Sequence, residues 1–156
     1  MRILGIDPGL QVCGYAVVDK IGSDGKLVEA GVFRSDSSKP LEIRLNQIAR
    51  DIRTVLENFK PEIMAVEQLY SHYAHPQTAI LMGHARGVIL QQAAAENIAV
   101  KSFAATKIKK SLTGNGRAGK PQMQRSIQSL LNLRELPEPP DVADAIAAAL
   151  CCANSI

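Results

Sequence analysis

The sequence has no tryptophan, and only three tyrosines and three phenylalanines. A hydrophobic core must therefore be built from Ile, Leu, Val and Ala, and 46% of the residues are hydrophobic. Three cysteines, of which Cys151 and Cys152 are adjacent, are too few for a disulfide framework. No apolar run approaches the ~20 residues of a membrane span, and the N-terminus lacks the regions of a signal peptide. These absences predict a cytoplasmic protein with no membrane contact.

The length of 156 residues, without a linker or an internal repeat, predicts a single domain over residues 1–156. Strands are expected over residues 2–6, 12–19, 27–34, 63–67 and 98–102, and helices over 41–58, 77–96, 104–112, 121–133 and 141–152. Short links make the first three strands antiparallel, and a helical crossover makes the fourth strand parallel to the first. We therefore expect an α/β fold with a five-stranded mixed sheet, three antiparallel strands then two parallel, flanked by helices on both faces.

The charge is unevenly distributed, although the net charge is only +3. Residues 101–134, called the basic segment below, contain eight basic residues and no acid, so this segment carries +8 and the remainder −5. Such an asymmetry favours a polyanionic partner, with a solvated helical surface as the alternative.

Two of the expected strands end in an acid. Asp7 follows the apolar residues 2–6 and precedes the turn at Pro8-Gly9, and Glu67 ends the run 63–67. Because side chains alternate along a strand, each acid shares a face with apolar residues of its own strand. If the two strands are parallel neighbours, both carboxylates lie at the same edge of the sheet.

A second pair of acids, Asp141 and Asp144, begins an alanine-rich helix and projects to one side of it. The small alanines would let this helix lie close to the sheet, with its acids near Asp7 and Glu67. Four close carboxylates repel one another unless cations lie between them. Two magnesium ions bound by these acids would relieve the repulsion and form the two-metal arrangement that hydrolyses phosphodiesters. Taken alone, each acid has an alternative explanation that is equally good. Asp7 could be a turn residue, Glu67 a strand end in solvent, Asp141 a helix N-cap and Asp144 an acid of the first helical turn.

Five blocks, in order along nearly the whole chain, resemble the RuvC family of crossover junction endodeoxyribonucleases, the Holliday junction resolvases. The blocks are Ile3-Leu4-Gly5-Ile6-Asp7-Pro8-Gly9 with Gly14-Tyr15-Ala16-Val17-Val18, Ala65-Val66-Glu67-Gln68, Gly83-His84-Ala85-Arg86-Gly87, the stretch 109–124, and Asp141-Val142-Ala143-Asp144-Ala145. The resemblance implies an RNase H-like fold and a magnesium-dependent endonuclease of DNA recombination and repair. It also implies a homodimer that nicks four-way junction DNA in symmetric pairs, leaving 5′-phosphate and 3′-hydroxyl ends, with the RuvA–RuvB branch-migration complex as a partner.

Carried over residue by residue, the resemblance assigns Asp7, Glu67, Asp141 and Asp144 as ligands of two Mg²⁺ ions, with Mn²⁺ as an alternative ion. Lys120 is implied as a further catalytic residue, and Tyr70 as an aromatic that stacks on bases near the crossover. The expected DNA-binding residues are Tyr70, Arg86, Lys107, Lys109, Lys110, Arg117 and Lys120.

The chain departs from the family pattern in the stretch from Glu67 to Gly83, which is one residue longer than expected, and His84 stands where Gln is common. His72 and His75 are interpreted as loop residues rather than metal ligands. Ala79, Gly83 and Gly87 recur every four residues along a helix, which suits either packing on the chain's own sheet or a two-fold dimer contact.

Three other functions are weighed against this one. A fragment of an actin-like or sugar-kinase ATPase would need a second domain and a second nucleotide-binding motif, and the sequence has neither. An inactive DNA-binding module of the same fold would not be expected to keep all four acids. A nuclease for RNA–DNA hybrids or ribosomal RNA would differ in lacking the dimer and the preference for junctions.

Overall fold

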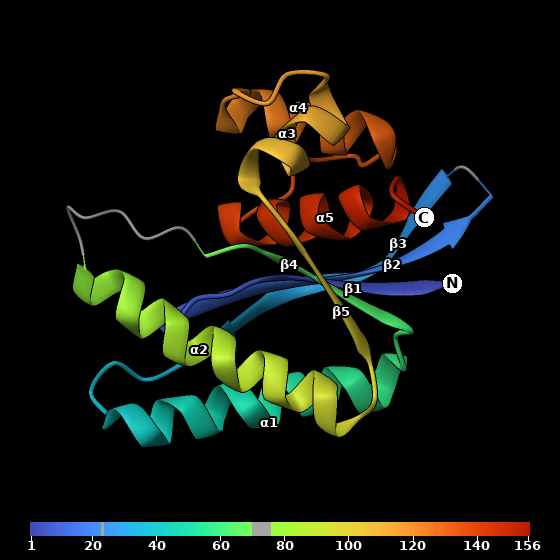
Figure 1. Cartoon of the computed structure of the whole chain (residues 1–156). Helices are drawn as coiled ribbons and strands as arrows, with labels where there is room; N and C mark the ends of the chain where they lie inside the picture. The colour runs from blue at the N-terminus through green and yellow to red at the C-terminus, as the bar shows by residue number, and fades with distance from the viewer. Residues whose placement is uncertain (23, 70–75) are drawn as a thin grey trace.

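The computed structural model describes residues 1–22, 24–69 and 76–156. Its strands form one five-stranded sheet in the order β3-β2-β1-β4-β5, with helices on both faces (Figure 1). The strands are β1 (Arg2–Asp7), β2 (Val12–Ile21), β3 (Asp24–Arg34), β4 (Ile63–Glu67) and β5 (Ala99–Phe103). The helices are α1 (Leu41–Phe59), α2 (Pro76–Ala95), α3 (Ala105–Thr113), α4 (Lys120–Leu130) and α5 (Pro140–Ala153). None of the described helices is long and apolar enough to cross a bilayer.

The strand pairing confirms the predicted mixed sheet. β2 pairs antiparallel with β1 and β3, whereas β4 pairs parallel with β1 and β5. Two boundaries differ from the prediction by three residues, and the others by two or fewer. β3 begins at Asp24 because the β2–β3 ladder continues to the pair Ile21↔Asp24, and α4 ends at Leu130 because Asn132 adopts a left-handed conformation (φ 50°), which asparagine tolerates better than most residues.

Two hydrophobic clusters cover the two faces of the sheet. Leu4 and Ile6 of β1 point to the cluster formed with α1 and α2. Ile3 points to the opposite cluster, which contains most of α5. This alternation places the side chain of Asp7 on the α5 face, as predicted from the strand period.

Helix α5 lies directly on the sheet, and α3 and α4 form a further layer on its outer side (Figure 1). Helix α5 lies against β1 at Gly5. A Cβ atom there would come within 2.1 Å of the carbonyl oxygen of Ala145 and 2.9 Å of the Cβ of Ala149. Any side chain at Gly5 would therefore push the helix away. Glycine in the strand and alanine in the helix together bring the start of α5 to the edge where β1 and β4 end.

Candidate active site

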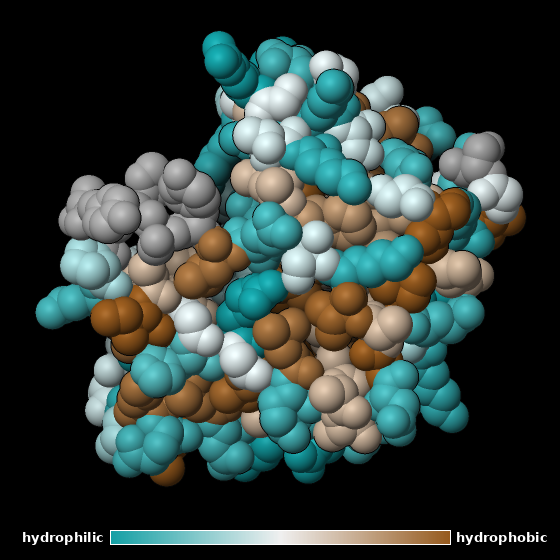
Figure 2. Space-filling view, viewed as in Figure 1, coloured by the Kyte–Doolittle hydropathy of each residue, from teal (hydrophilic) through white to brown (hydrophobic). Residues whose placement is uncertain are grey.

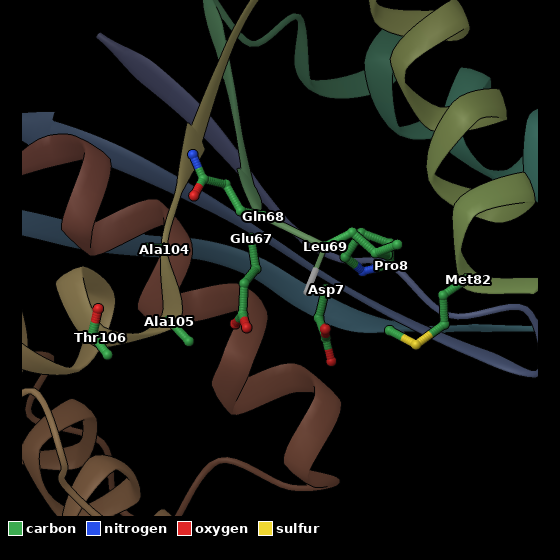
Figure 3. A pocket seen from close by; sticks show the side chains of 9 residues that line it. All are labelled: Asp7, Pro8, Glu67, Gln68, Leu69, Met82, Ala104, Ala105 and Thr106. Carbon is green, nitrogen blue, oxygen red and sulfur yellow. The ribbon is translucent and has the colours of Figure 1, made fainter. Parts of the chain in front are cut away.

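Asp7 and Glu67 lie at the ends of neighbouring parallel strands. The β1–β4 register runs from Ile3↔Ile63 to Ile6↔Val66, so each acid follows directly after the last pair. Both side chains extend in the same direction, toward the side of the sheet that α5 covers (Figure 3). The predicted adjacency of these two acids is confirmed.

Asp141 and Asp144 lie in the first turns of α5. The helix begins at Pro140 and its N-cap residue is Pro139, so the explanation of Asp141 as a helix N-cap is wrong. The backbone of Asp141 lies against Gly14 of β2, which pairs with Asp7 in the β1–β2 ladder. Asp144, one turn further along, lines the same cavity as Glu67.

The electrostatics of these acids are those of a crowded, partly buried cluster. Burial, followed by the negative charges of Asp144, Asp141 and Glu67, raises the pKa of Asp7 to about 7. Burial and the charge of Asp144 also raise the pKa of Glu67, and burial is the main cause of a raised pKa at Asp144. The charge of Asp141 acts on Asp7 and Asp144, and that of Asp144 acts on Asp7 and Glu67. The acids therefore lie in one cluster, which an isolated turn or a solvent-exposed strand end would not form.

Two lysines of the basic segment oppose this repulsion. A cavity of about 200 Å³ is lined by Glu67 and Asp144 together with Lys109 and Lys120. The charge of Lys120 lowers the pKa of both Asp7 and Asp144, and that of Lys109 lowers the pKa of Glu67 and Asp144. These two cations therefore lie beside the acid cluster and line a cavity with two of its members.

A larger cavity of about 660 Å³ adjoins Asp7 and Glu67 (Figure 3). It is lined by Asp7, Pro8, Glu67, Gln68, Leu69, Met82, Ala104, Ala105 and Thr106. Met82 comes from α2 and Thr106 from α3, and neither was predicted from the sequence, because no local motif marks a residue that reaches the site only when its helix docks. The cavity combines an acidic floor with largely apolar walls.

The chemistry of the donors fits a hard divalent cation. In residues 1–22, 24–69 and 76–156, no three His, Cys, Asp or Glu side chains are arranged as a ready-made ligand group. Negative charges nevertheless raise the pKa values of Asp7, Glu67 and Asp144, and a cation among the carboxylates would relieve that repulsion. Carboxylate oxygens suit Mg²⁺ and Mn²⁺ alike, so the donor set fits the group without identifying the ion.

The other expected DNA-binding residues have varied surroundings. Arg86 donates a hydrogen bond of 2.9 Å from a terminal nitrogen to the Oγ of Ser102, which anchors it to β5. Lys107 lies 5.0 Å from the centroid of the Phe103 ring. Lys110 and Arg117 are exposed. Over the described ranges, none of the cations of the basic segment forms an ion pair with an acid. Tyr70, His72 and His75 lie outside the described residues.

The small-residue stripe of α2 does not pack on the sheet at two of its three positions. A Cβ atom added at Gly83 or at Gly87 would have no neighbour within 4 Å in the part of the chain that the structure describes. Ile80, on the same side of the helix, is 60% exposed. Apolar side chains gather over this part of the surface, whereas hydrophilic ones prevail over α3 and α4 (Figure 2).

Comparison with known proteins gives consistent matches over nearly the whole chain. Residues 3–152 match the family model described as crossover junction endodeoxyribonuclease RuvC. A protein of that name from Rhodopirellula baltica is 50% identical over 149 residues, which cover 96% of this chain and 84% of the relative. A solved Thermus thermophilus RuvC structure is similar with a TM-score of 0.89 at 31% identity, covering 97% of this chain and 92% of that chain. A Thermus thermophilus RuvC in complex with a Holliday junction substrate is similar with a TM-score of 0.88 at 28% identity, with the same coverage of 97% and 92%.

Proposed function

This chain belongs to the RuvC family of crossover junction endodeoxyribonucleases, and from that premise we propose that it resolves Holliday junctions during DNA recombination and repair. The reaction is phosphodiester hydrolysis in two symmetric, paired nicks that leave 5′-phosphate and 3′-hydroxyl ends. The observation that carries the proposal is the meeting of acids from β1, β4 and α5 beside two lysines of the basic segment. The RNase H-like nuclease domain would comprise residues 1–156.

The nucleases of this family depend on divalent metal ions. We assign Asp7, Glu67, Asp141 and Asp144 as the residues that hold two Mg²⁺ ions, with Mn²⁺ as an alternative. Bound ions of this kind supply an attacking water of lowered pKa and stabilise charge on the departing 3′ oxygen. The raised pKa values of Asp7, Glu67 and Asp144 support the assignment, because a set of acids that resists ionisation together is a set that gains from cations.

The lysines beside the acids orient the scissile phosphate. Lys109 and Lys120 line the same cavity as Glu67 and Asp144, so a phosphate drawn to their ammonium groups lies against the carboxylate cluster. Lys120 acts as the catalytic lysine by stabilising negative charge that grows on the phosphate oxygens during hydrolysis. Lys109 holds the DNA strand in register through the attraction between its ammonium group and a phosphate.

Further contacts to the junction come from the surface around the site. Lys107, Lys110 and Arg117 extend from α3 and the loop after it and contact phosphates. Arg86 reaches the DNA from α2 while tied to Ser102. Tyr70 stacks on a base near the crossover point, and loss of junction processing in Tyr70→Ala tests that role.

Paired nicking needs two sites, and we propose that two chains meet through the open face of α2. The exposed Ile80 and the unpacked Gly83 and Gly87 support this contact, because a helix with small residues can approach a copy of itself closely. The RuvA–RuvB branch-migration complex would deliver the junction. The three buried, unpaired cysteines suit the cytoplasm, where we place this activity.

The test is incubation with a synthetic four-way junction and Mg²⁺, beside a linear duplex of the same sequence and an RNA–DNA hybrid. Symmetric nicks in the junction alone, abolished by EDTA, support the proposal. Preferential cutting of the hybrid would move the function to another nuclease of the same fold, and failure to cut any of the three would remove the enzyme assignment.

A further inference from the structure

The turn between β1 and β2, residues 8–11, follows Asp7 directly and is hydrogen-bonded to Ser35, a buried residue outside the acid cluster. The β1–β2 ladder begins at the pair Asp7↔Gly14, and the β1–β4 ladder ends at Ile6↔Val66. Beyond Asp7 the sheet therefore no longer holds this stretch of chain. Pro8 is buried and lines the larger cavity together with Asp7, so a shift of the turn moves one wall of the site.

Ser35, the residue that follows β3, binds two carbonyl groups of this turn. Its Oγ donates a hydrogen bond of 2.5 Å to the carbonyl oxygen of Leu10. Its backbone N–H donates one of 3.2 Å to the carbonyl oxygen of Gln11. Ser35 is only 8% exposed, and a buried hydroxyl is stable only when its hydrogen bonds are made.

Arg44 of α1 determines which way the Ser35 hydroxyl points. Its Nε donates a hydrogen bond of 3.0 Å to the Oγ of Ser35. Because a guanidinium can only donate, the hydroxyl must accept from Arg44, and its single hydrogen is left for Leu10. Two successive hydrogen bonds thus connect α1 to the turn: Arg44 donates to Ser35, and Ser35 donates to Leu10.

The turn has little room to adjust by itself. A Cβ atom at Gly9 would lie 2.0 Å from the carbonyl oxygen of Val12, so the chain folds back on itself tightly. Asp7 is meanwhile repelled by the acids around it. Leu10 of the turn packs in the cluster with α1 and α2, and the hydrogen bonds from Ser35 fix the direction of the backbone on either side of the Leu10–Gln11 peptide.

We propose that Ser35 and Arg44 are positioning residues for the active site: they clamp the 8–11 turn and thereby hold the carboxylate of Asp7 where a divalent ion and the scissile phosphate meet. This inference rests on the proposed function. Neither residue touches the substrate or the ion, so both act through Asp7. Small displacements of a catalytic group are costly, with ~100-fold losses in rate for a shift of about 1 Å.

The test compares Ser35→Ala and Arg44→Gln with Ser35→Thr, which keeps the hydroxyl, and with Ser38→Ala. Ser38 lies in the same loop, and its hydroxyl donates a hydrogen bond to the exposed side chain of Asp36. Three quantities are measured for each variant at a temperature where it is folded: the single-turnover cleavage rate, the junction Kd in EDTA, and the rise in Tm on adding Mg²⁺ without DNA.

We expect Ser35→Ala and Arg44→Gln to cleave about 10- to 100-fold more slowly, with an unchanged junction Kd and a smaller Mg²⁺-induced rise in Tm. Ser35→Thr should recover most of the rate, and Ser38→Ala should match the parent chain. A lower Tm with the parent's cleavage rate and Mg²⁺ response would overturn the proposal, as would a loss explained entirely by weaker junction binding. If Ser35→Ala does not fold, Arg44→Gln decides. A parent chain that cuts no junction would refute the proposed function, while the Mg²⁺ response would still test the clamp.

Discussion

Gly14 lies against the backbone of Asp141. A Cβ atom at Gly14 would come within 2.0 Å of the carbonyl oxygen of Asp141, and Gly14 is also the ladder partner of Asp7. One glycine in β2 therefore sets the distance between the acid that ends β1 and the acid that begins α5. The site depends on the absence of a side chain at this position as much as on the four carboxylates.

We expect Gly14→Ala to damage both folding and cleavage, because the new methyl group meets backbone that cannot rotate away. Overpacking of this kind costs about 1–3 kcal/mol, and the displaced start of α5 should lower the cleavage rate by at least ~10-fold. Denaturant unfolding and single-turnover cleavage measure the two effects. Gly119→Ala is the matched control, since the nearest described atom to a Cβ there is in the Pro121 ring, at the ordinary contact distance of 3.8 Å. Equal stability and equal cleavage rates of the two variants would show that α5 can move away from Gly14 without loss.

The strand-end acids could be predicted from the sequence because two simple regularities determine them. Side chains alternate along β1 and β4, and a helical crossover makes the two strands parallel neighbours. Asp7 and Glu67 then meet whatever the details of packing. The approach of α5 was predictable in outline from its alanines, whereas its beginning at Pro140 depends on how the preceding loop packs.

Which basic residues face the acids could not be predicted from charge alone. The basic segment reads as one cationic stretch, yet only Lys109 and Lys120 line the cavity with Glu67 and Asp144. That selection follows from the way α3 and α4 dock on α5. The Ser35 clamp is hidden for the same reason, because it joins residues 10, 35 and 44 through tertiary contacts without a local motif.

Asp7→Asn should abolish cleavage while leaving junction binding intact. The amide keeps the size of the side chain but removes one negative charge from the ion-binding set, and we expect a rate loss of about 100-fold or more. Junction affinity in EDTA should be equal to or slightly better than that of the parent chain, because a negative charge near DNA phosphates is lost. The comparison uses cleavage rates in Mg²⁺ and binding curves in EDTA. Cleavage at the parental rate would exclude Asp7 from the metal site.

Without divalent ions, the stability of the chain should carry a pH dependence that Asp7→Asn lacks. The pKa of Asp7 is raised from 3.8 to about 7, first by burial and then by the neighbouring acids. The folded state therefore keeps a proton that the unfolded state has released, so the stability from this group is fully present below pH 3.8 and is lost as the pH rises to about 7. Other acids, such as the Asp19 that pairs with Arg2, have a lowered pKa and an opposite slope, so the difference between the two proteins is the quantity to measure.

At pH 8 in EDTA, we expect Asp7→Asn to be more stable than the parent chain by about 1–3 kcal/mol. The full shift would correspond to ~4 kcal/mol, but the carboxylate is partly exposed and is screened by solvent. Adding Mg²⁺ should reverse the order, because only the parent chain then gains ion binding. Denaturant unfolding at pH 4 and pH 8 measures both effects, and parallel pH profiles for the two proteins would contradict the crowding of acids at Asp7.

Lys120→Ala and Lys109→Ala should weaken the response of junction binding to salt. Each lysine that neutralises one phosphate contributes about 0.9 to the slope of log K against log salt, so each substitution should reduce that slope by ~1. Lys120→Ala should also lower the cleavage rate at saturating junction. Lys39→Ala, at an exposed residue before α1, is the charge-matched control and should leave the slope unchanged. A slope that neither cavity lysine alters would mean that the phosphate backbone does not pass through the cavity.

Gly83→Glu and Gly87→Glu should convert a dimer into single chains. Among residues 1–22, 24–69 and 76–156, neither change has a neighbour within 4 Å to disturb. The fold and its Tm should therefore be preserved, while two carboxylates would face each other across a two-fold contact at α2. Light scattering gives the mass, and a junction labelled on opposite strands separates single nicks from paired ones. Thr54→Glu, at an exposed position of α1, is the control for added charge. We expect the α2 variants to nick junctions once without resolving them, because each chain retains its acids but loses the second site. A parental mass with paired nicks would place the dimer contact on another surface.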